Sequence, residues 1–162
     1  MRLKLNSVLI DTNLLLLLII GLFDKKIISS HKRTKIFVPE DFDLLISTIN
    51  GYDMLWVTSH CFAETSNLLR QTNAKTATDL MNFFSTLVSR NIAKIRESHI
   101  PINIIMGNNI LPRLGITDTG ILIKAKQVSL VLTVDLYLYL EISNKGYKAL
   151  NFNYLRQEKY LK

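Results

Sequence analysis

The stretch VLIDTN at residues 8–13, followed by the apolar run at residues 14–20, decides the fold of this chain. Three consecutive aliphatic residues, two of them β-branched, are typical of a strand buried on both faces, and Asp11 stands where that strand ends. Thr12 and Asn13 can cap the helix that the leucine-rich run forms. A strand, an acid and a helix start in direct succession predict an open α/β sheet with its chemistry at the carboxyl ends of the strands.

Length and composition indicate one domain. The chain has 162 residues, of which 48% are hydrophobic, so it can bury a sizeable core. We expect a single domain over 1–162, with the motif-bearing part at 8–152 and a basic C-terminal tail at 153–162. Cys61 is the only cysteine, which excludes an internal disulfide and a cysteine metal cluster. The net charge of +7 favours a polyanionic partner such as nucleic acid, because clustered cations displace phosphate counterions.

The N-terminal sequence raises the question of a membrane segment. Residues 1–4 and the apolar residues after them imitate a signal peptide, but Asp11 and Asn13 interrupt the pattern. The uninterrupted apolar run at 14–23 is short of the roughly twenty residues that span a bilayer. We therefore expect a buried helix there, and a soluble cytoplasmic protein with no membrane partner.

Along the rest of the chain strands alternate with helices. This alternation predicts a three-layer α/β/α fold with a mainly parallel central sheet. We expect an exposed basic loop at 24–35, and we expect Pro112 to end a short helix and Thr117 to cap the next. Predicted strands lie at 54–58, 128–134 and 147–152, with 92–95 either a strand or a helix end. Predicted helices lie at 39–50, from Cys61 to about Leu69, and at 76–89, 102–111, 121–127 and 136–144.

Four acids are not accounted for by loops or ordinary helix starts: Asp11, Glu64, Asp118 and Asp135. Each follows a predicted strand or lies in the first turns of a helix, so a parallel sheet could bring them together at one edge. Each also has a structural alternative. Asp11 and Asp135 could be helix caps, Asp118 a first-turn acid and Glu64 a solvated helix residue. Glu97 fits neither group clearly.

Four carboxylates in one place would raise one another's pKa values unless a positive charge lay among them. A divalent cation is the simplest such charge, and oxygen ligands without His or Cys suit Mg²⁺ or Mn²⁺ rather than zinc. Such ions hold phosphates and lower the pKa of a bound water, which favours phosphodiester hydrolysis. His60 beside Cys61 does not make a zinc site, because the chain has no second cysteine.

These residues resemble the PIN domain (PilT N-terminal) family, metal-dependent ribonucleases that include the toxins of many bacterial toxin-antitoxin pairs. The resemblance covers roughly residues 8–152. It consists of four motifs in the order of the family: IDTN at 10–13, FAETSN at 62–67, LGITD at 114–118 and LTVD at 132–135. The resemblance implies a Mg²⁺- or Mn²⁺-dependent endoribonuclease, of the kind found as a toxin or in a defence system, that cuts RNA with an activated water and leaves a 5′-phosphate.

The resemblance also assigns roles to particular residues. It implies that Asp11, Glu64, Asp118 and Asp135 ligate the metal, directly or through water. Asn13 and Thr133 would orient the acids or the water by hydrogen bonding. RNA is the implied substrate, and an antitoxin or other protein inhibitor and a second copy of the chain are the partners that such a nuclease could have. The basic segment 24–35 and the middle segment 52–110 are longer than in the most compact members of the family. The substrate choice and partner surfaces of the family therefore cannot be assigned to this chain.

Two other functions fit the same residues. One is a PIN-like module that binds RNA or protein without cutting, although a non-catalytic protein has no need for costly buried acids. The other is a structure-specific DNA nuclease, which differs only in its substrate. The segment 91–98 and the tail cations Arg156, Lys159 and Lys162 could contact phosphates, but a solvated basic face is the favoured interpretation of the tail. We expect Tyr137, Tyr139 and Tyr147 to pack in the core rather than to stack on bases.

Overall fold

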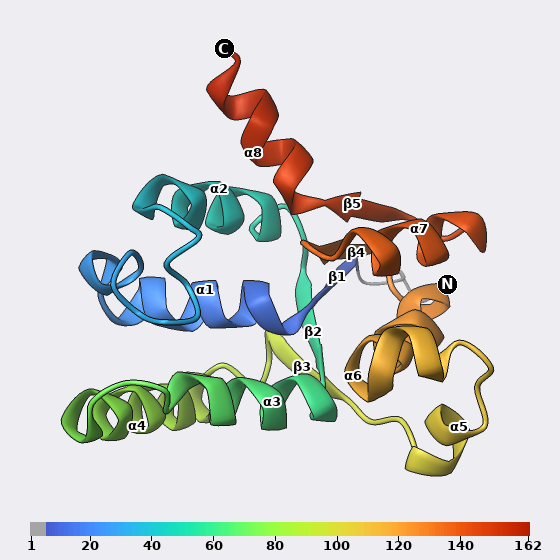
Figure 1. Ribbon diagram of the computed structural model, residues 1–162, viewed down its shortest axis with the longest axis horizontal. Coiled ribbons are helices and arrows are strands. Elements are labelled where there is room, and N and C mark those ends of the chain that lie inside the picture. The colour runs from blue at the N-terminus through green and yellow to red at the C-terminus, as the bar shows by residue number, and fades with distance from the viewer. Residues whose placement is uncertain (1–5) are drawn as a thin grey trace.

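A computed structural model describes residues 6–162 of the chain (Figure 1). Within these residues five strands form one all-parallel sheet in the order β3-β2-β1-β4-β5, so the expected α/β class is confirmed. The strands are β1 (Ser7–Ile10), β2 (Met54–Thr58), β3 (Ile95–Ser98), β4 (Leu130–Thr133) and β5 (Ala149–Asn151). Because the strands are parallel, all five carboxyl ends meet at one edge of the sheet.

Helices cover both faces of the sheet. The α-helices are α1 (Thr12–Phe23), α2 (Pro39–Ile49), α3 (Ser59–Leu69), α4 (Ala74–Arg90), α5 (Ile102–Met106), α6 (Leu111–Lys124), α7 (Leu136–Asn144) and α8 (Phe152–Tyr160), and the short 3-10 helices are η1 (Lys25–Ile27) and η2 (Ala125–Gln127). Figure 1 shows α1 to α4 on one side of the strands and α5 to α7 on the other. This arrangement agrees with right-handed crossovers between parallel strands.

Strand β1 and helix α1 lie at the centre of the molecule. Strand β1 pairs with β2 on one side and β4 on the other, and Leu9 aligns with Trp56 and Val131. Every residue of 14–20 in α1 is buried, which explains why this helix is apolar all around. Gly21 lets the Phe42 ring of α2 pack directly on the α1 backbone, since a Cβ there would lie 2.1 Å from the ring.

None of the helices within residues 6–162 is long and apolar enough to cross a membrane. The buried helix expected at the leucine-rich run is present as α1. Residues 1–4, which imitate a signal peptide in the sequence, lie outside the described residues.

Two local predictions were wrong. The segment 24–35 is not simply an exposed loop, because its Ile28, His31 and Thr34 are buried and the Thr34 hydroxyl donates to the Ile28 carbonyl at 2.8 Å. Pro112 does not end a helix. It lies in the first turn of α6. Backbone N–H groups of the first turn have no partner within the helix, so proline, which lacks this group, is tolerated there. The helix is instead interrupted at Gly115, whose φ is 78°.

The basic tail is mostly the helix α8, and its central cation is not free. Arg156 Nη2 lies 2.9 Å from Asp41 Oδ2, and the Asp41 side chain is fully buried. Arg156 also donates to the Ile36 carbonyl at 2.9 Å, and Tyr160 donates to Asp41. The interpretation of Arg156 as part of a solvated face was therefore wrong: it joins α8 to α2.

Candidate functional site

Asp11 follows β1 and is nearly inaccessible to solvent, with 3% of its surface exposed. Its Oδ1 accepts the backbone N–H of Leu14 at 2.9 Å and so caps α1. Its Oδ2 accepts the hydroxyl of Thr133 at 2.6 Å and the backbone N–H of Val134 at 2.8 Å. Three donors from two segments therefore fix this carboxylate where the carboxyl ends of β1 and β4 lie side by side.

The end of β4 supplies both a support and a second acid. The Thr133 hydroxyl donates to Asp11 and accepts the backbone N–H of Asp135 at 3.0 Å. Asp135 Oδ1 in turn accepts the N–H of Leu138 at 2.8 Å and caps α7. The hydrogen bond expected from Thr133 to an acid is thus present, and both aspartates act as the caps that the sequence allowed.

Glu64 and Asp118 come from the helices α3 and α6. The Thr117 hydroxyl donates to Glu64 Oε2 at 2.6 Å, which ties the two helices together beside the sheet edge. We expected the Thr117 side chain to cap a helix, but its hydroxyl donates to Glu64 instead. The helix α6 is interrupted at Gly115, two residues before Thr117. Its φ of 78° is a conformation that glycine adopts without strain.

The negative charges of three carboxylates act on the fourth, that of Asp118. The pKa of Asp118 is raised from 3.8 to about 7, first by burial and then by the negative charges of Asp11, Asp135 and Glu64. Burial also raises the pKa of Asp11, with Asp135 contributing, although its hydrogen bonds oppose the shift. We call Asp11, Glu64, Asp118 and Asp135 the acidic cluster. Asp11, Glu64 and Asp135, which are far apart in the sequence, therefore lie near enough to Asp118 for their charges to raise its pKa.

Cys61 lies close to the same edge. Burial raises the pKa of its thiol to about 12, and the charges of Asp11 and Glu64 add to this shift. At neutral pH the thiol is therefore protonated, and only thiolates are effective nucleophiles or metal ligands. Cys61 is a packing residue of the core.

The donor chemistry of the acidic cluster fits a hard divalent cation. All its side chains offer carboxylate oxygens, which Mg²⁺ and Mn²⁺ prefer. Within residues 6–162 no three or more His, Cys, Asp or Glu side chains come close enough together, as the side chains lie, to hold a metal ion between them. Mg²⁺ keeps several waters and binds through one or two carboxylates, so an open site of this kind remains compatible with that ion.

Within the described residues neither Asn13 nor Glu97 makes a hydrogen bond to the acidic cluster. Asn13 is exposed in the first turn of α1, and no side-chain hydrogen bond of Asn13 is found within residues 6–162. Glu97 is exposed at the end of β3, where it accepts the Ser59 hydroxyl at 2.8 Å. Glu97 is not among the charges that raise the pKa of Asp118.

Sequence reasoning missed three neighbours of the acidic cluster. The backbone N–H of Val134 and the hydroxyl of Thr117 are hydrogen-bond donors whose partners are set by tertiary packing, so no local pattern reveals them. The third is Tyr137, which is 67% exposed, so the prediction that it packs in the core was wrong. Tyr147 does pack against the core as expected, and Tyr139 contacts Tyr154 edge to face.

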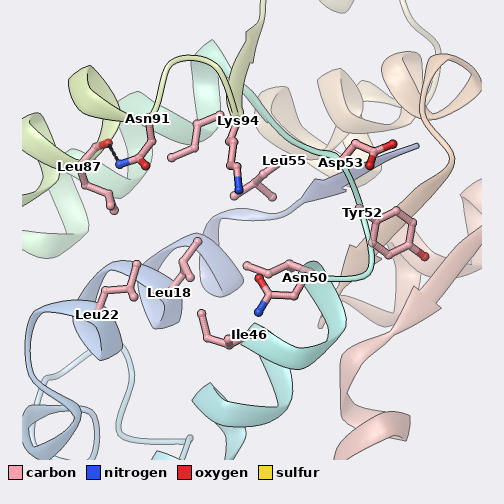
Figure 2. Close-up of a pocket in the computed structure, with 12 residues that line it drawn as sticks. Leu18, Leu22, Ile46, Asn50, Tyr52, Asp53, Leu55, Leu87, Asn91 and Lys94 are labelled. Atoms are coloured by element: carbon pink, nitrogen blue, oxygen red, sulfur yellow. Dashed lines mark hydrogen bonds between the residues drawn. The ribbon is translucent and has the colours of Figure 1, made fainter. Parts of the chain in front are cut away.

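A hollow lies at the opposite edge of the sheet (Figure 2). Its volume is about 520 Å³, and it is bounded by Leu55 near the amino end of β2 and Ile95 at the start of β3. Leu18 and Ile46 of α1 and α2 form an apolar wall. The carboxylate in the lining is Asp53, which already accepts the Asn6 N–H at 3.0 Å. This hollow therefore lacks the group of acids that the predicted chemistry needs.

Comparison of the chain with protein-family models, with curated proteins and with solved structures gave no match. What the chain does must therefore be argued from its own residues and their geometry.

Proposed function

We propose that this chain is a Mg²⁺- or Mn²⁺-dependent endoribonuclease of the PIN type. The observation that carries the proposal is the mutual effect of the acidic cluster, in which three carboxylates help to raise the pKa of Asp118 to about 7. Gathering like charges at one sheet edge is unfavourable unless a bound cation neutralises them. The strand order 3-2-1-4-5 and the four sequence motifs are consistent with a PIN-like fold.

Each member of the acidic cluster has a specific role in the proposed reaction. Asp11 is oriented in advance by its three hydrogen bonds and keeps lone pairs for a cation or its water. Asp118 and Asp135 would hold the ion together with Asp11, and Glu64, fixed by Thr117, would contact it directly or through water. When bound, Mg²⁺ or Mn²⁺ supplies a water of lowered pKa and positive charge for the phosphate. Thr133 keeps Asp11 in place, and Asn13 is free to contact substrate or water.

A cleavage assay tests the proposal directly. The purified chain is incubated with an end-labelled single-stranded RNA in the presence of Mn²⁺, Mg²⁺ or EDTA. We expect cleavage with either ion, none with EDTA, and a 5′-phosphate on the product. Asp118→Asn should lower the rate at least about 100-fold, the upper end of what substitutions around a metal site cost. Asp79→Asn is the matched control, because Asp79 pairs with Lys75 on the surface of α4, and its rate should not change.

The same assay separates the alternatives. A DNA strand of identical sequence is run beside the RNA, and cleavage of DNA alone would make the chain a DNA nuclease. Binding of the RNA without cleavage under every metal condition would make it a non-catalytic module. A rate for Asp118→Asn equal to that of the unchanged chain would remove the acidic cluster from the chemistry.

A further inference from the structure

A hollow of about 200 Å³ is lined by Arg113, Leu114 and Tyr137. Arg113 and Leu114 belong to α6, which goes on to Asp118, while Tyr137 lies in the first turn of α7 directly after Asp135. Helices α6 and α7 pack against each other. The hollow therefore opens between the two helices that carry half of the acidic cluster.

Tyr137 is the least buried aromatic residue near this edge. Its side chain is 67% exposed, and the neighbouring Leu136 and Ile116 are 47% and 38% exposed. An aromatic ring so exposed contributes little to the core, but its face can stack on another planar ring. Its position in the first turn of α7 keeps it within a short distance of Asp135.

Arg113 supplies a cation at the rim of the same hollow. Its Nη2 lies 3.5 Å from Glu141 Oε1, and the Arg113 side chain is 66% exposed whereas that of Glu141 is 22% exposed. The more buried carboxylate of α7 thus orients a guanidinium whose face and edges remain open to solvent. A planar guanidinium can stack on a base or pair with a phosphate.

We propose that this hollow binds one unpaired base of a single-stranded RNA whose phosphodiester lies at the acidic cluster. The volume of about 200 Å³ is below the roughly 300–1,000 Å³ of whole-ligand pockets, so it suits one planar group of a larger ligand. A tyrosine face and an arginine are the groups on which unpaired bases stack. The net charge of +7 favours a polyanion over an apolar protein surface. The inference rests on the proposed function, since the acidic cluster is what would hold the phosphate.

Binding with Ca²⁺ in place of Mg²⁺ tests the base site, because this hard cation also takes oxygen ligands and neutralises the acidic cluster but does not impose the tight octahedral geometry of Mg²⁺. The probe is a short fluorescein-labelled RNA strand of mixed sequence, and its anisotropy gives the dissociation constant. Tyr137→Ala should weaken binding about tenfold or more, the effect of losing one stacked base. Tyr137→Phe keeps the ring and should stay within about twofold. Tyr154→Ala removes a half-exposed tyrosine outside the hollow and should bind like the unchanged chain.

Two further probes identify what Tyr137 contacts. A strand of the same length without bases should bind more weakly and show no dependence on Tyr137. A fully paired duplex should also lose that dependence, because its bases are already stacked. Equal affinity of Tyr137→Ala and the unchanged chain for the single strand would overturn the proposal, as would no measurable binding of the unchanged chain. Self-association that Tyr137→Ala abolishes without changing RNA affinity would show a protein interface instead, and would overturn it too.

The outcome is independent of whether the chain cuts RNA. If Tyr137→Ala loses affinity but the unchanged chain cleaves nothing with Mn²⁺, the base site is supported and the nuclease is rejected. If cleavage proceeds with Mn²⁺ and Tyr137→Ala has an unchanged KM, the nuclease is supported and the base site is rejected.

Discussion

Asp11 combines a structural role with its proposed one. It caps α1 through Leu14, as many aspartates do, and its other oxygen is held by Thr133 and Val134 across the sheet. A helix cap alone needs only the first of these bonds. The additional donors satisfy the second oxygen of this buried carboxylate and fix its orientation.

Thr133→Val tests this orientation. The substitution keeps the shape of a fully buried side chain but removes the hydroxyl that donates to Asp11 and accepts from Asp135. We expect the free energy of unfolding in urea to fall by about 1–3 kcal/mol, the cost of unsatisfied buried polar groups. Thr133→Ser retains the hydroxyl and should keep most of the metal-dependent cleavage that Thr133→Val loses. Equal activity of the two variants would refute the positioning role of the hydroxyl.

Asp118 should make stability depend on pH. Its pKa is about 7 in the folded chain against an ordinary value of 3.8, so between these pH values the folded state binds more protons than the unfolded state. The free energy of unfolding therefore falls as pH rises from about 4 to 7, and the full cost remains above pH 7. Asp118→Asn cannot ionise, so its stability advantage over the unchanged chain should grow over this range.

Thermal unfolding at a series of pH values measures that advantage. Near pH 4 the two chains should differ least, and above pH 7 the variant should have the higher Tm. Adding Mg²⁺ above pH 7 should reverse the order, because a ligand stabilises only the chain that binds it. A Tm difference that does not change with pH would show that Asp118 is not held among like charges.

The sequence allowed some of these residues to be found but not others. Asp11 and Asp135 could be predicted because a strand end and a helix cap are both local patterns. The bond from Thr117 to Glu64 depends on how α3 and α6 pack, and the exposure of Tyr137 depends on which face of α7 meets the sheet. No local pattern carries that information, so these residues required the structure.

At the scale of elements, α8 is joined to the body by a buried ion pair. The Asp41 carboxylate is fully buried, accepts the Val38 N–H at 2.9 Å and pairs with Arg156 at 2.9 Å. Arg156 Nη1 also donates to Asn153, whose amide donates to the Val134 carbonyl at 3.3 Å. A chain of contacts thus runs from α2 through α8 to the peptide segment that holds Asp11.

Arg156→Ala should therefore destabilise the chain strongly. Removing one partner of a buried pair costs about 3–5 kcal/mol, because the other charge is left unpaired. Lys159→Ala is the control on the same helix, since its exposed ammonium contacts only a backbone carbonyl, and it should change stability by less than about 0.5 kcal/mol. Urea unfolding of both variants measures the difference. Similar midpoints would show that the pair does not anchor α8.

The elements themselves were largely predictable, and the errors have physical causes. Buried strands, caps and amphipathic helices are periodic signals, so most of the predicted elements are present with shifted ends. The prediction of an exposed loop at 24–35 was based on its many cations. It was wrong because Ile28, His31 and Thr34 of the same segment are buried. The prediction that Pro112 ends a helix was wrong because proline is also common in the first turn of a helix, which is its place in α6.

At the scale of the whole molecule, the topology determines where chemistry can occur. The parallel order 3-2-1-4-5 brings Asp11 and Asp135 to the same edge at the ends of adjacent strands, and α3 and α6 add Glu64 and Asp118 there. The hollow of about 520 Å³ lies at the other edge, and Asp53 is the carboxylate in its lining. We propose that the carboxyl edge holds a divalent cation.

Calorimetric titration of Mn²⁺ into the metal-free chain above pH 7 tests this claim most directly. We expect a binding isotherm for the unchanged chain and for the surface control Asp79→Asn. In Asp11→Asn and Asp118→Asn, whose folding is checked by circular dichroism, the affinity should fall at least about tenfold. No binding heat from the unchanged chain, or the same affinity in the folded Asp118→Asn variant, would contradict a metal site at the acidic cluster.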